Sequence, residues 1–390
     1  MKKILLLLSM LCCFVVADEF IESSTTLGGY GELHYDREGE TLDFHRFIFY
    51  IKHTFDNEWS MMSEVEIEHN MVGSEAALKS EGGYVALEQA YLNYWNGNWG
   101  FQGGVILVPA GITNEYHEPP TFMSVERPSY NKYIIPSTWF ENGFAFYGKT
   151  GNVNWKYAMT GDMNGDGIDK GIRDGRDKGF KSSASDWTKT FQGSWTGMDG
   201  LKVGGSVTMN DAPATADADW LETNDCGAGQ DKACNNEIIR DAVGFTLTEV
   251  NATYSKNNIY TRMEYGSINY TDNVHVRTCT GADANANGLC DDVETENDDD
   301  DWTEVGLDEV TGSNGYYLDL GYNVADMIGF DGDLYVWTRT SEYSKDDRSD
   351  ATEVCLFGVT FKPMENISIK LEAGEEGGDD VMRMGLGYMF

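Results

Sequence analysis

Stretches in which apolar and polar residues alternate at every second position recur along most of the chain. In "SEVEIEH", Val65 and Ile67 alternate with glutamates, and in "ISIKLEA" the apolar residues alternate with a serine, a lysine and a glutamate. A period of two is that of a β-strand with one apolar and one polar face. A chain built this way must give the two faces of its strands two different surroundings.

Followed from end to end, the pattern predicts sixteen strands, of roughly the ten residues that a tilted strand needs to cross a hydrocarbon layer. They span residues 28–37, 41–55, 59–69, 84–95, 99–108, 140–149, 153–161, 187–196, 201–209, 240–254, 258–270, 315–324, 331–343, 352–362, 366–374 and 381–390. Glycine (44) and aromatic residues (13%) are frequent, and proline (7) is rare. An even strand number is typical of single-chain outer-membrane barrels.

The predicted connections have two lengths. Short ones contain "NGNWG", "TGNVN", "GMDG" and "PMENI", whereas long ones span about 109–139, 162–186, 210–239 and 271–314. A soluble all-β protein has no reason for this asymmetry, but a barrel with short turns on one side of a membrane does. We therefore expect an all-β fold, a transmembrane antiparallel β-barrel of about sixteen strands with short periplasmic turns and long acidic extracellular loops.

The first residues, "MKKILLLLSMLCCFVVADEF", have the three parts of a secretory signal: a charged start, an apolar stretch and small residues ending at Ala17. We predict that residues 1–17 are a signal peptide and that residues 18–390 form a barrel in the bacterial outer membrane. The last predicted strand presents an apolar face that ends in Tyr388 and Phe390. This ending resembles the C-terminal assembly signal of outer-membrane proteins, which implies outer-membrane lipid and the barrel assembly machinery as partners.

The formal net charge is −37. Contacts to phosphate groups require lysine and arginine, so this charge argues against nucleic acid as a partner. It favours divalent cations or a saline environment.

Residues 28–148 resemble the family of the phosphate-selective porins O and P and their broad relatives. The stretches that carry the resemblance are "GGYGELHYD", "LDFHRFIFYIKHTF", "SEVEIEH", "LEQAYLNYW", "GGVILVPAGITNEYHEPPTF", "VERPSYNKYIIPSTWFENGFAFYG" and, further on, "GIRDGRDKG" and "GLGYMF". The resemblance implies a sixteen-stranded, homotrimeric diffusion channel of the outer membrane. It does not carry over phosphate, because the anion-selective members line their pores with lysine and arginine, and this chain has 28 of those against 65 aspartates and glutamates.

The segment 109–139 is too long for an ordinary turn between two strands. Folded into the lumen it would narrow the pore, as the resemblance implies, and otherwise it is a surface loop ordered by its prolines. Its candidate constriction residues are Asn114, Glu115, His117, Glu118, Glu126, Arg127 and Lys132. The alternation adds lumen-facing candidates on three strands: Arg46, Lys52, Glu64, Glu66, Glu68 and Glu88. Such an acidic ladder would concentrate cations, or its members simply solvate the wall and pair with Arg46, Lys52 and Arg262.

Two loops have calcium-like spacing. "DANANGLCDDVE" places Asp283, Asn285, Asn287, Asp291 and Glu294 at the ligand positions of a twelve-residue calcium loop. "DMNGDGIDKGIR" starts equally well with Asp162, Asn164 and Asp166 but has Arg173 at its closing position. The alternative for both is an acidic, solvated surface loop, so no cofactor is required and Ca²⁺ is the candidate ligand.

The cysteines suggest two local disulfides, Cys226–Cys234 and Cys279–Cys290, which suit an oxidising compartment. Cys355 is left over in a predicted strand. The remaining histidines, His34, His45, His53, His69 and His275, lie on separate strands or loops and are expected to have structural roles.

No nucleophile, base and orienting group occur at a recognisable spacing, and the prolines of "HEPP" oppose a metalloenzyme helix, so we expect no enzyme. The leading function is passive diffusion of small hydrophilic solutes through a porin, general or cation-leaning. The alternatives are an anion- or phosphate-selective porin, with Arg46, Lys52, Arg127 and Lys132 converging at the constriction, and a barrel-anchored surface protein that binds calcium or acts as an adhesin.

Overall fold

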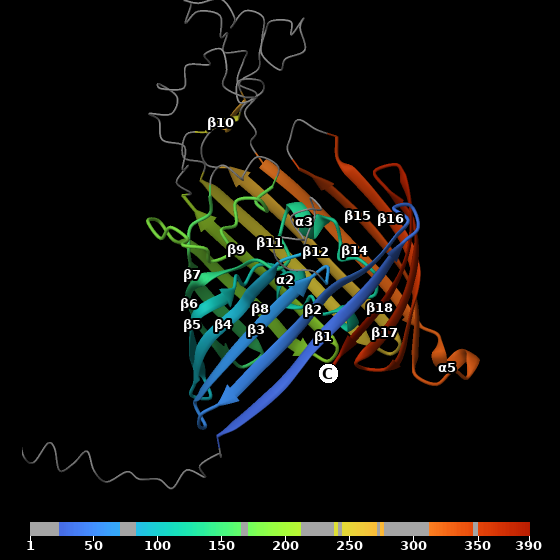
Figure 1. The fold of residues 1–390 in the computed structure, drawn as a ribbon, viewed down its shortest axis with the longest axis horizontal. Coiled ribbons are helices and arrows are strands. Elements are labelled where there is room, and N and C mark those ends of the chain that lie inside the picture. Colours follow the sequence, from blue (N-terminus) through green and yellow to red (C-terminus); the bar gives the residue numbers. More distant parts are fainter. Residues whose placement is uncertain are drawn as a thin grey trace, which may run out of the picture.

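The computed structural model describes residues 23–70, 83–164, 171–211, 238–240, 244–270, 274–276, 312–345 and 350–390. The chain forms one closed, antiparallel barrel of sixteen strands, together with a separate two-stranded sheet of β10 and β13 (Figure 1). The fold class and the strand number expected from the alternation are confirmed.

The barrel strands are β1 (Ser24–Asp36), β2 (Thr41–Thr54), β3 (Trp59–Glu68), β4 (Val85–Trp95), β5 (Trp99–Leu107), β6 (Phe140–Thr150), β7 (Val153–Thr160), β8 (Thr188–Met198), β9 (Leu201–Asn210), β11 (Phe245–Lys256), β12 (Ile259–Tyr270), β14 (Gly312–Asn323), β15 (Asp333–Ser344), β16 (Thr352–Met364), β17 (Ile367–Glu376) and β18 (Asp379–Met389). The separate sheet contains β10 (Ile238–Arg240) and β13 (Val274–Val276). Four short helical turns complete the described elements: α2 (Ile112–Glu115), η2 (Pro119–Thr121), α3 (Tyr130–Tyr133) and α5 (Ala325–Ile328). No helix in the described parts of the chain is both long and apolar enough to cross a membrane.

The first and last strands close the barrel. Strand β1 pairs with β18 from Tyr30↔Met389 to Asp36↔Arg383. The backbone of Gly29 exchanges two hydrogen bonds with that of Phe390, at 3.1 and 2.9 Å. Because every barrel strand therefore has two neighbours, the barrel leaves no open sheet edge.

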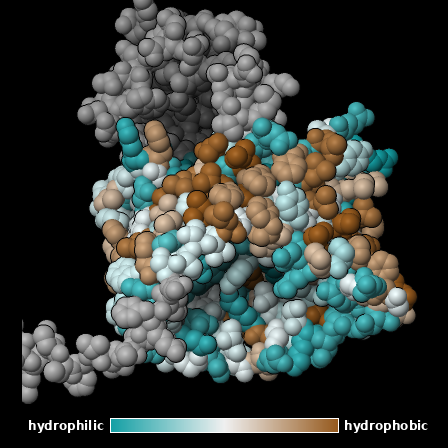
Figure 2. All heavy atoms as spheres, turned by 60° about the horizontal axis from the view of Figure 1, so that its bottom comes forward, coloured by the Kyte–Doolittle hydropathy of each residue, from teal (hydrophilic) through white to brown (hydrophobic). Residues whose placement is uncertain are grey.

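The outer face of the barrel is apolar. Side chains such as Phe144, Val250, Leu320, Phe357 and Met384 are exposed on it, and the polar members of the same strands point inward. Figure 2 shows apolar side chains gathered over the wall and hydrophilic ones at the lower rim. The predicted outward face of β18, with Met382, Met384 and Leu386, is part of this surface. Cys355 is free and exposed on β16, whose outward side chains include Phe357.

The connections differ between the two ends of the barrel, as expected. At one end, residues 55–58, 96–98, 151–152, 199–200, 257–258 and 365–366 form short turns, and α5 occupies the longer connection 324–332. Asn257 and Asn258 both have positive φ, 54° and 66°, which is the signature of the type I′ turn that fits strand twist in a two-residue hairpin. The other end carries the long connections, including 69–84, which the sequence pattern did not single out.

Strand β4 contains a bulge that explains how Glu88 faces the lumen. Glu88 is an even number of residues from Ala90, Leu92 and Tyr94, so strict alternation would place it on the same face as these three. In the structure Glu64 pairs with Gln89 and Val65 with Leu87, so Glu88 is the extra residue of a β-bulge. The bulge turns Glu88 inward while Leu87 and Leu92 remain exposed outside.

Candidate functional site

The connection between β5 and β6, residues 108–139, lies inside the barrel and is called the inner loop here; its turns α2 and α3 are seen within the ring of strands in Figure 1. Its neck is closed by Asn114, whose side chain donates to the carbonyls of Val108 (2.8 Å) and Trp139 (3.0 Å) and accepts from the Trp139 amide (2.7 Å). Asn114 is fully buried. Asn114, which was predicted to be a constriction residue, therefore holds the two ends of the inner loop together.

The inner loop reaches the opposite wall of the barrel. It starts and ends on β5 and β6, yet its backbone is hydrogen-bonded by side chains of β15 to β17. The Lys370 ammonium donates to the Ser124 carbonyl at 2.7 Å, and the Glu372 carboxylate accepts from the Val125 amide at 2.7 Å. Arg339 donates to the Glu126 carbonyl at 3.3 Å. The loop therefore spans the lumen.

Apolar packing fixes the loop against that wall. The buried cluster combines Tyr130, Ile134, Ile135 and Trp139 of the loop with Phe245, Leu247, Ile268, Tyr317, Tyr343, Val354 and Leu356 of the strands. Burying each large apolar side chain contributes about 1.5–3 kcal/mol. The barrel thus contains a hydrophobic core of its own, and the loop is a fixed part of the lumen.

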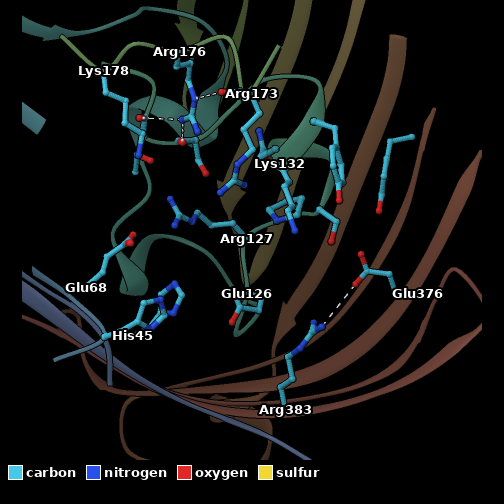
Figure 3. A pocket seen from close by; sticks show the side chains of 18 of the residues that line it. His45, Glu68, Glu126, Arg127, Lys132, Arg173, Arg176, Lys178, Glu376 and Arg383 are labelled. Carbon is cyan, nitrogen blue, oxygen red and sulfur yellow. Dashed lines mark hydrogen bonds and ion pairs between the residues drawn. The ribbon is translucent and has the colours of Figure 1, made fainter. Parts of the chain in front are cut away.

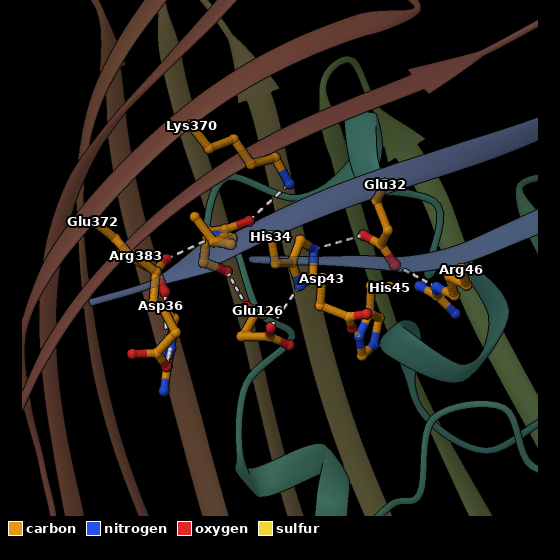
Figure 4. A network of polar contacts seen from close by, with 12 residues as sticks. Glu32, His34, Asp36, Asp43, His45, Arg46, Glu126, Lys370, Glu372 and Arg383 are labelled. Carbon is orange, nitrogen blue, oxygen red and sulfur yellow. Dashed lines mark hydrogen bonds and ion pairs between the residues drawn. The ribbon is translucent and has the colours of Figure 1, made fainter. Parts of the chain in front are cut away.

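Polar contacts join the loop to β1 and β2 on the other side (Figure 4). Buried Arg46 forms an ion pair with Glu32 and donates to the His117 carbonyl at 3.0 Å. The Nδ1 atom of His34 lies 2.7 Å from a carboxylate oxygen of Glu126. These contacts tie both parts of the inner loop to the first hairpin.

Three histidines expected to lie apart are brought together here. The rings of His34 and His45 stack at 4.8 Å between centroids, and the His69 ring meets that of His45 edge-on at 5.3 Å. Asp43 lies between His45 and His69, 3.2 and 2.8 Å from their Nδ1 atoms. These residues are far apart in sequence, and the pairing of β1 with β2 and of β2 with β3 brings them together.

The glutamates predicted to form an acidic ladder do face inward, but the inner loop covers them. Glu64, Glu66 and Glu88, called the carboxylate cluster here, are all buried. His117 of the loop is buried beside them, with its Nε2 atom 3.7 Å from a Glu88 oxygen. These three residues are therefore shielded from passing solutes, because a side of the loop packs over them. Glu68, one step further along β3, does line an open cavity.

A second segment enters the lumen after β7. Residues 171–186, called the basic segment here, pack on the inner loop: the Ile172 amide donates to the Tyr133 carbonyl, and Arg176 donates to the carbonyls of Ser137 (3.0 Å) and Thr138 (3.2 Å). Glu141 accepts from the Gly179 amide at 2.8 Å and from Ser182 at 2.7 Å. The sequence predicts this segment only as part of a long external loop, 162–186, and gives it no place in the site. The sequence does contain a signal for this segment, the closely spaced basic residues Arg173, Arg176 and Lys178.

The inner loop and the basic segment together line a cavity of about 500 Å³ at the long-loop end, called the vestibule here (Figure 3). Its cationic residues are Arg127, Lys132, Arg173, Arg176, Lys178 and Arg383, and its acidic residues are Glu68, Glu126 and Glu376. Arg383 is paired with Glu372 and Glu376. Among the described residues, no ion pair joins the other five cations to a carboxylate. The vestibule is therefore positively charged inside an acidic protein.

The pKa values in the vestibule reflect this crowding of positive charge. Burial and the neighbouring Arg46 lower the pKa of Arg127, and burial with the nearby Arg173 lowers that of Arg176 to about 10. Burial and Arg176 also lower the pKa of Lys178, whose ammonium donates to the Tyr84 hydroxyl at 3.0 Å. An anion entering the vestibule would relieve this repulsion.

A second cavity of about 540 Å³ lies toward the short turns and is called the turn-side cavity here. It is lined by Glu115 and Tyr116 of the inner loop and by Lys149, Lys156 and Lys202 of the wall. The Lys202 ammonium lies over the Tyr116 ring, 4.8 Å from its centroid. The inner loop thus contributes to the walls of both cavities, and both contain more cations than carboxylates.

The remaining predicted residues have the following places. Lys52 is exposed near the short-turn end of β2, away from the vestibule that it was expected to share with Arg127 and Lys132. Glu118 is half-buried beside the carboxylate cluster. Tyr388 and Phe390 stack at 6.4 Å, and Phe390 also stacks on Phe47.

Several predicted groups lie outside the described residues: the signal peptide 1–17, the calcium-like loop 283–294, and the cysteines Cys226, Cys234, Cys279 and Cys290. Of the second calcium-like loop, Asp162 is described. Its carboxylate accepts hydrogen bonds from the Ser185 amide at 2.7 Å and from Asn210 at 3.1 Å, so it is occupied in holding the end of β9 to this loop.

Among the described residues, three groups of side chains have the spacing to hold a metal ion: His34, His45 and Glu126; Asp43, His45 and His69; and Glu64, Glu88 and His117. The first two are partly exposed and border the vestibule, whereas the third is buried under the inner loop.

No family model matches the sequence. An uncharacterized protein of Aquifex aeolicus (strain VF5) is 40% identical over 150 residues, which is 37% of this chain and 33% of that relative. The matched part thus spans about a third of the length of that relative.

Solved porin structures share the fold. OmpF of Salmonella typhi, in complex with daunomycin, superposes with a TM-score of 0.55 at 12% identity and covers 94% of this chain and 97% of its own. The anion-selective porin of Comamonas acidovorans superposes with a TM-score of 0.56 at 10% identity and covers 95% of this chain and 100% of its own. The trimer form of OmpT from Vibrio cholerae superposes with a TM-score of 0.54 at 11% identity and covers 94% of this chain and 99% of its own. At such identities the likeness establishes a porin-like barrel and nothing finer.

Proposed function

We propose that this protein is an outer-membrane porin that lets small hydrophilic solutes diffuse passively through its lumen. The observation that carries the proposal is a closed barrel with an apolar outside and a polar interior narrowed by an inward-folded loop. An apolar outer band is what a hydrocarbon layer requires, because a lipid-facing charge at mid-depth costs roughly 2–4 kcal/mol. Water and polar side chains then occupy the part of the enclosed space that the apolar cluster of the inner loop leaves open.

Solute uptake into liposomes tests diffusion directly. Liposomes that contain the folded barrel and are placed in uncharged sugars should swell, and the rate should fall steeply with sugar size because the inner loop fills much of the lumen. Sugars larger than the two cavities should not enter. Equal rates for protein-containing and protein-free liposomes would contradict the proposal.

We further propose that the channel favours small anions. Its support is the vestibule, where five lysines and arginines without a carboxylate partner among the described residues face a common space, followed by three lysines in the turn-side cavity. Cationic rings of this kind select anions at close quarters. Phosphate belongs among the anions to be tested, since the first half of the chain resembles the phosphate-selective porins.

Cation preference is the second candidate, and the net charge of −37 favours it. Much of that charge lies in the long connections, for example in "ENDDDD" (296–301), and a surface field acts over about a Debye length, roughly 10 Å at 0.1 M salt. The charges that a solute meets inside the barrel should therefore decide selectivity.

The reversal potential in a salt gradient separates the two candidates. We expect an anion preference that weakens in Arg127→Gln and in Lys132→Gln, because each removes one vestibule charge. Lys256→Gln is the matched control, since Lys256 is exposed at a short turn and pairs with Asp199. A cation preference in the unmodified channel would overturn the anion proposal and leave the porin proposal standing.

Two further proposals concern assembly. A homotrimer is supported by the fold shared with porins that include the trimer form of OmpT, and unheated gel mobility with crosslinking tests it. A role of Phe390 in barrel assembly is supported by its position at the closing seam, where its backbone bonds to Gly29. Loss of correctly inserted protein in Phe390→Ser would support that role.

A further inference from the structure

The buried group of Glu64, Glu88 and His117 joins three separate parts of the fold. Glu64 lies on β3, Glu88 on β4 and His117 on the inner loop, and one ligand atom from each lies within 4.8 Å of the others. Their relative exposures are 2%, 0% and 2%. Side chains from a wall and a loop thus meet in a space closed to solvent.

The polar atoms in this space lack partners. Both carboxylate oxygens of Glu88 lack a hydrogen-bond partner among the described residues, and so does the Nε2 atom of His117. Their mutual contact, 3.7 Å, is too long for a hydrogen bond. A buried polar atom without a partner costs about 1–3 kcal/mol, so several in one place point to a ligand that satisfies them together.

The tautomer of His117 suits a metal ligand. Its Nδ1 atom lies 3.0 Å from the Asn114 carbonyl, which can only accept, so Nδ1 carries the proton. The Nε2 atom then presents its lone pair toward Glu88. A histidine whose other nitrogen donates to a backbone carbonyl is the usual arrangement at metal sites.

The β4 bulge provides independent support. Glu88 is the extra residue opposite Glu64 and Val65, and the bulge is what turns it inward next to Gln89. Gln89 donates to one oxygen of Glu64. Bulges often re-aim a side chain next to a functional site.

A bound cation would also balance the charge of the neighbouring carboxylates. Glu66 is buried beside Glu88, and neither of its oxygens has a hydrogen-bond partner among the described residues. Arg46 forms a close ion pair with Glu32 and a longer one, at 3.6 Å, with Glu66. Three buried carboxylates therefore face one arginine that is already engaged.

We propose that Glu64, Glu88 and His117 bind a divalent first-row transition-metal ion. One imidazole nitrogen with carboxylate oxygens suits Zn²⁺, Fe²⁺ or Mn²⁺, whereas Ca²⁺ prefers six to eight oxygens. The two other histidine groups are weaker candidates because their histidines and carboxylates already pair with each other, at 2.7 to 3.2 Å. A metal here would fasten the inner loop to the wall at β3 and β4. The inference goes beyond the proposed function and does not depend on it.

The test uses Co²⁺ as a visible probe on the full barrel, extracted in detergent and stripped with a chelator. We expect one Co²⁺ per chain at this site, with d–d absorption typical of mixed nitrogen and oxygen ligands, and displacement by Zn²⁺ but not by an equal concentration of Ca²⁺. Glu88→Gln and His117→Gln should weaken Co²⁺ binding by more than about tenfold, since loss of a ligand costs at least as much as loss of a residue that only orients one.

Glu264→Gln is the matched control. Glu264 is also buried and has one oxygen without a partner, and no described metal-like group includes it. Heat-modifiable gel mobility shows which variants fold. If Glu88→Gln does not fold, His117→Gln alone tests the loss of a ligand. No Co²⁺ spectrum in the folded protein, or the same affinity in all three variants, would overturn the inference, whereas the porin proposal fails only if solutes do not pass.

Discussion

Single residues in this barrel have roles that depend on what the inner loop places over them. Alternation along β3 correctly predicted that Glu64 and Glu66 face inward. Their burial from solvent depends on His117 and the rest of the inner loop, which pack over them. Arg127 and Lys132, in contrast, line the vestibule, which is an open cavity. The period of a strand specifies the face of a residue and carries no information on what packs against that face.

Glu126 provides a pH-dependent contact between the loop and β1. Burial alone would raise the pKa of Glu126, but the positive charge of His34 at 2.7 Å outweighs it and holds this pKa well below its ordinary value of 4.5. A carboxylate with a lowered pKa stabilises the fold above its ordinary pKa, and this contribution is lost as the pH falls toward the lowered value.

We therefore expect the thermal midpoint of the unmodified barrel to fall more steeply than that of Glu126→Gln between about pH 5 and about pH 3. Glu353→Gln, at an exposed position of β16, should behave like the unmodified protein. Parallel curves for all three proteins would show that the contact between His34 and Glu126 does not contribute to stability.

The strands could be predicted from the sequence. The segments that fill the lumen could be predicted only in part. All sixteen predicted strands overlap barrel strands, because an inward polar and an outward apolar face leave a local signal in each strand. The length of 109–139 and the family resemblance predicted the inner loop. The bulge at Glu88, the histidine cluster and the basic segment were missed because each depends on contacts between residues distant in sequence.

Docking of the basic segment on the inner loop has a steric requirement at Gly171. This residue has a φ of 87°, and a Cβ added there would lie 2.0 Å from the Tyr133 carbonyl oxygen. We expect Gly171→Ala to displace the segment with Arg173 and Arg176, and so to reduce the anion preference in the reversal potential.

Gly97→Ala is the matched control, since Gly97 has a φ of 95° in a short turn and open space around it. Both variants carry the left-handed backbone cost of roughly 1–2 kcal/mol, so a change in selectivity confined to Gly171→Ala isolates the docking contact. An unchanged reversal potential in both would show that the basic segment does not set selectivity.

At the scale of the whole molecule, an acidic chain encloses two cavities that contain more cations than carboxylates. The net charge of −37 predicts how the protein meets solvent and ions from outside, whereas the cations of the vestibule and the turn-side cavity act on whatever enters. The apolar wall, the closed strand order and the loop held across the lumen together describe a barrel whose interior is narrow and fixed.

Single-channel recording in planar lipid bilayers tests the central claim, that ions pass through this lumen. The heat-modifiable, folded protein should insert in discrete steps of small conductance that grow with salt concentration, and a salt gradient should give a reversal potential on the anion side. Folded protein that inserts into the bilayer without any conductance steps would contradict the claim.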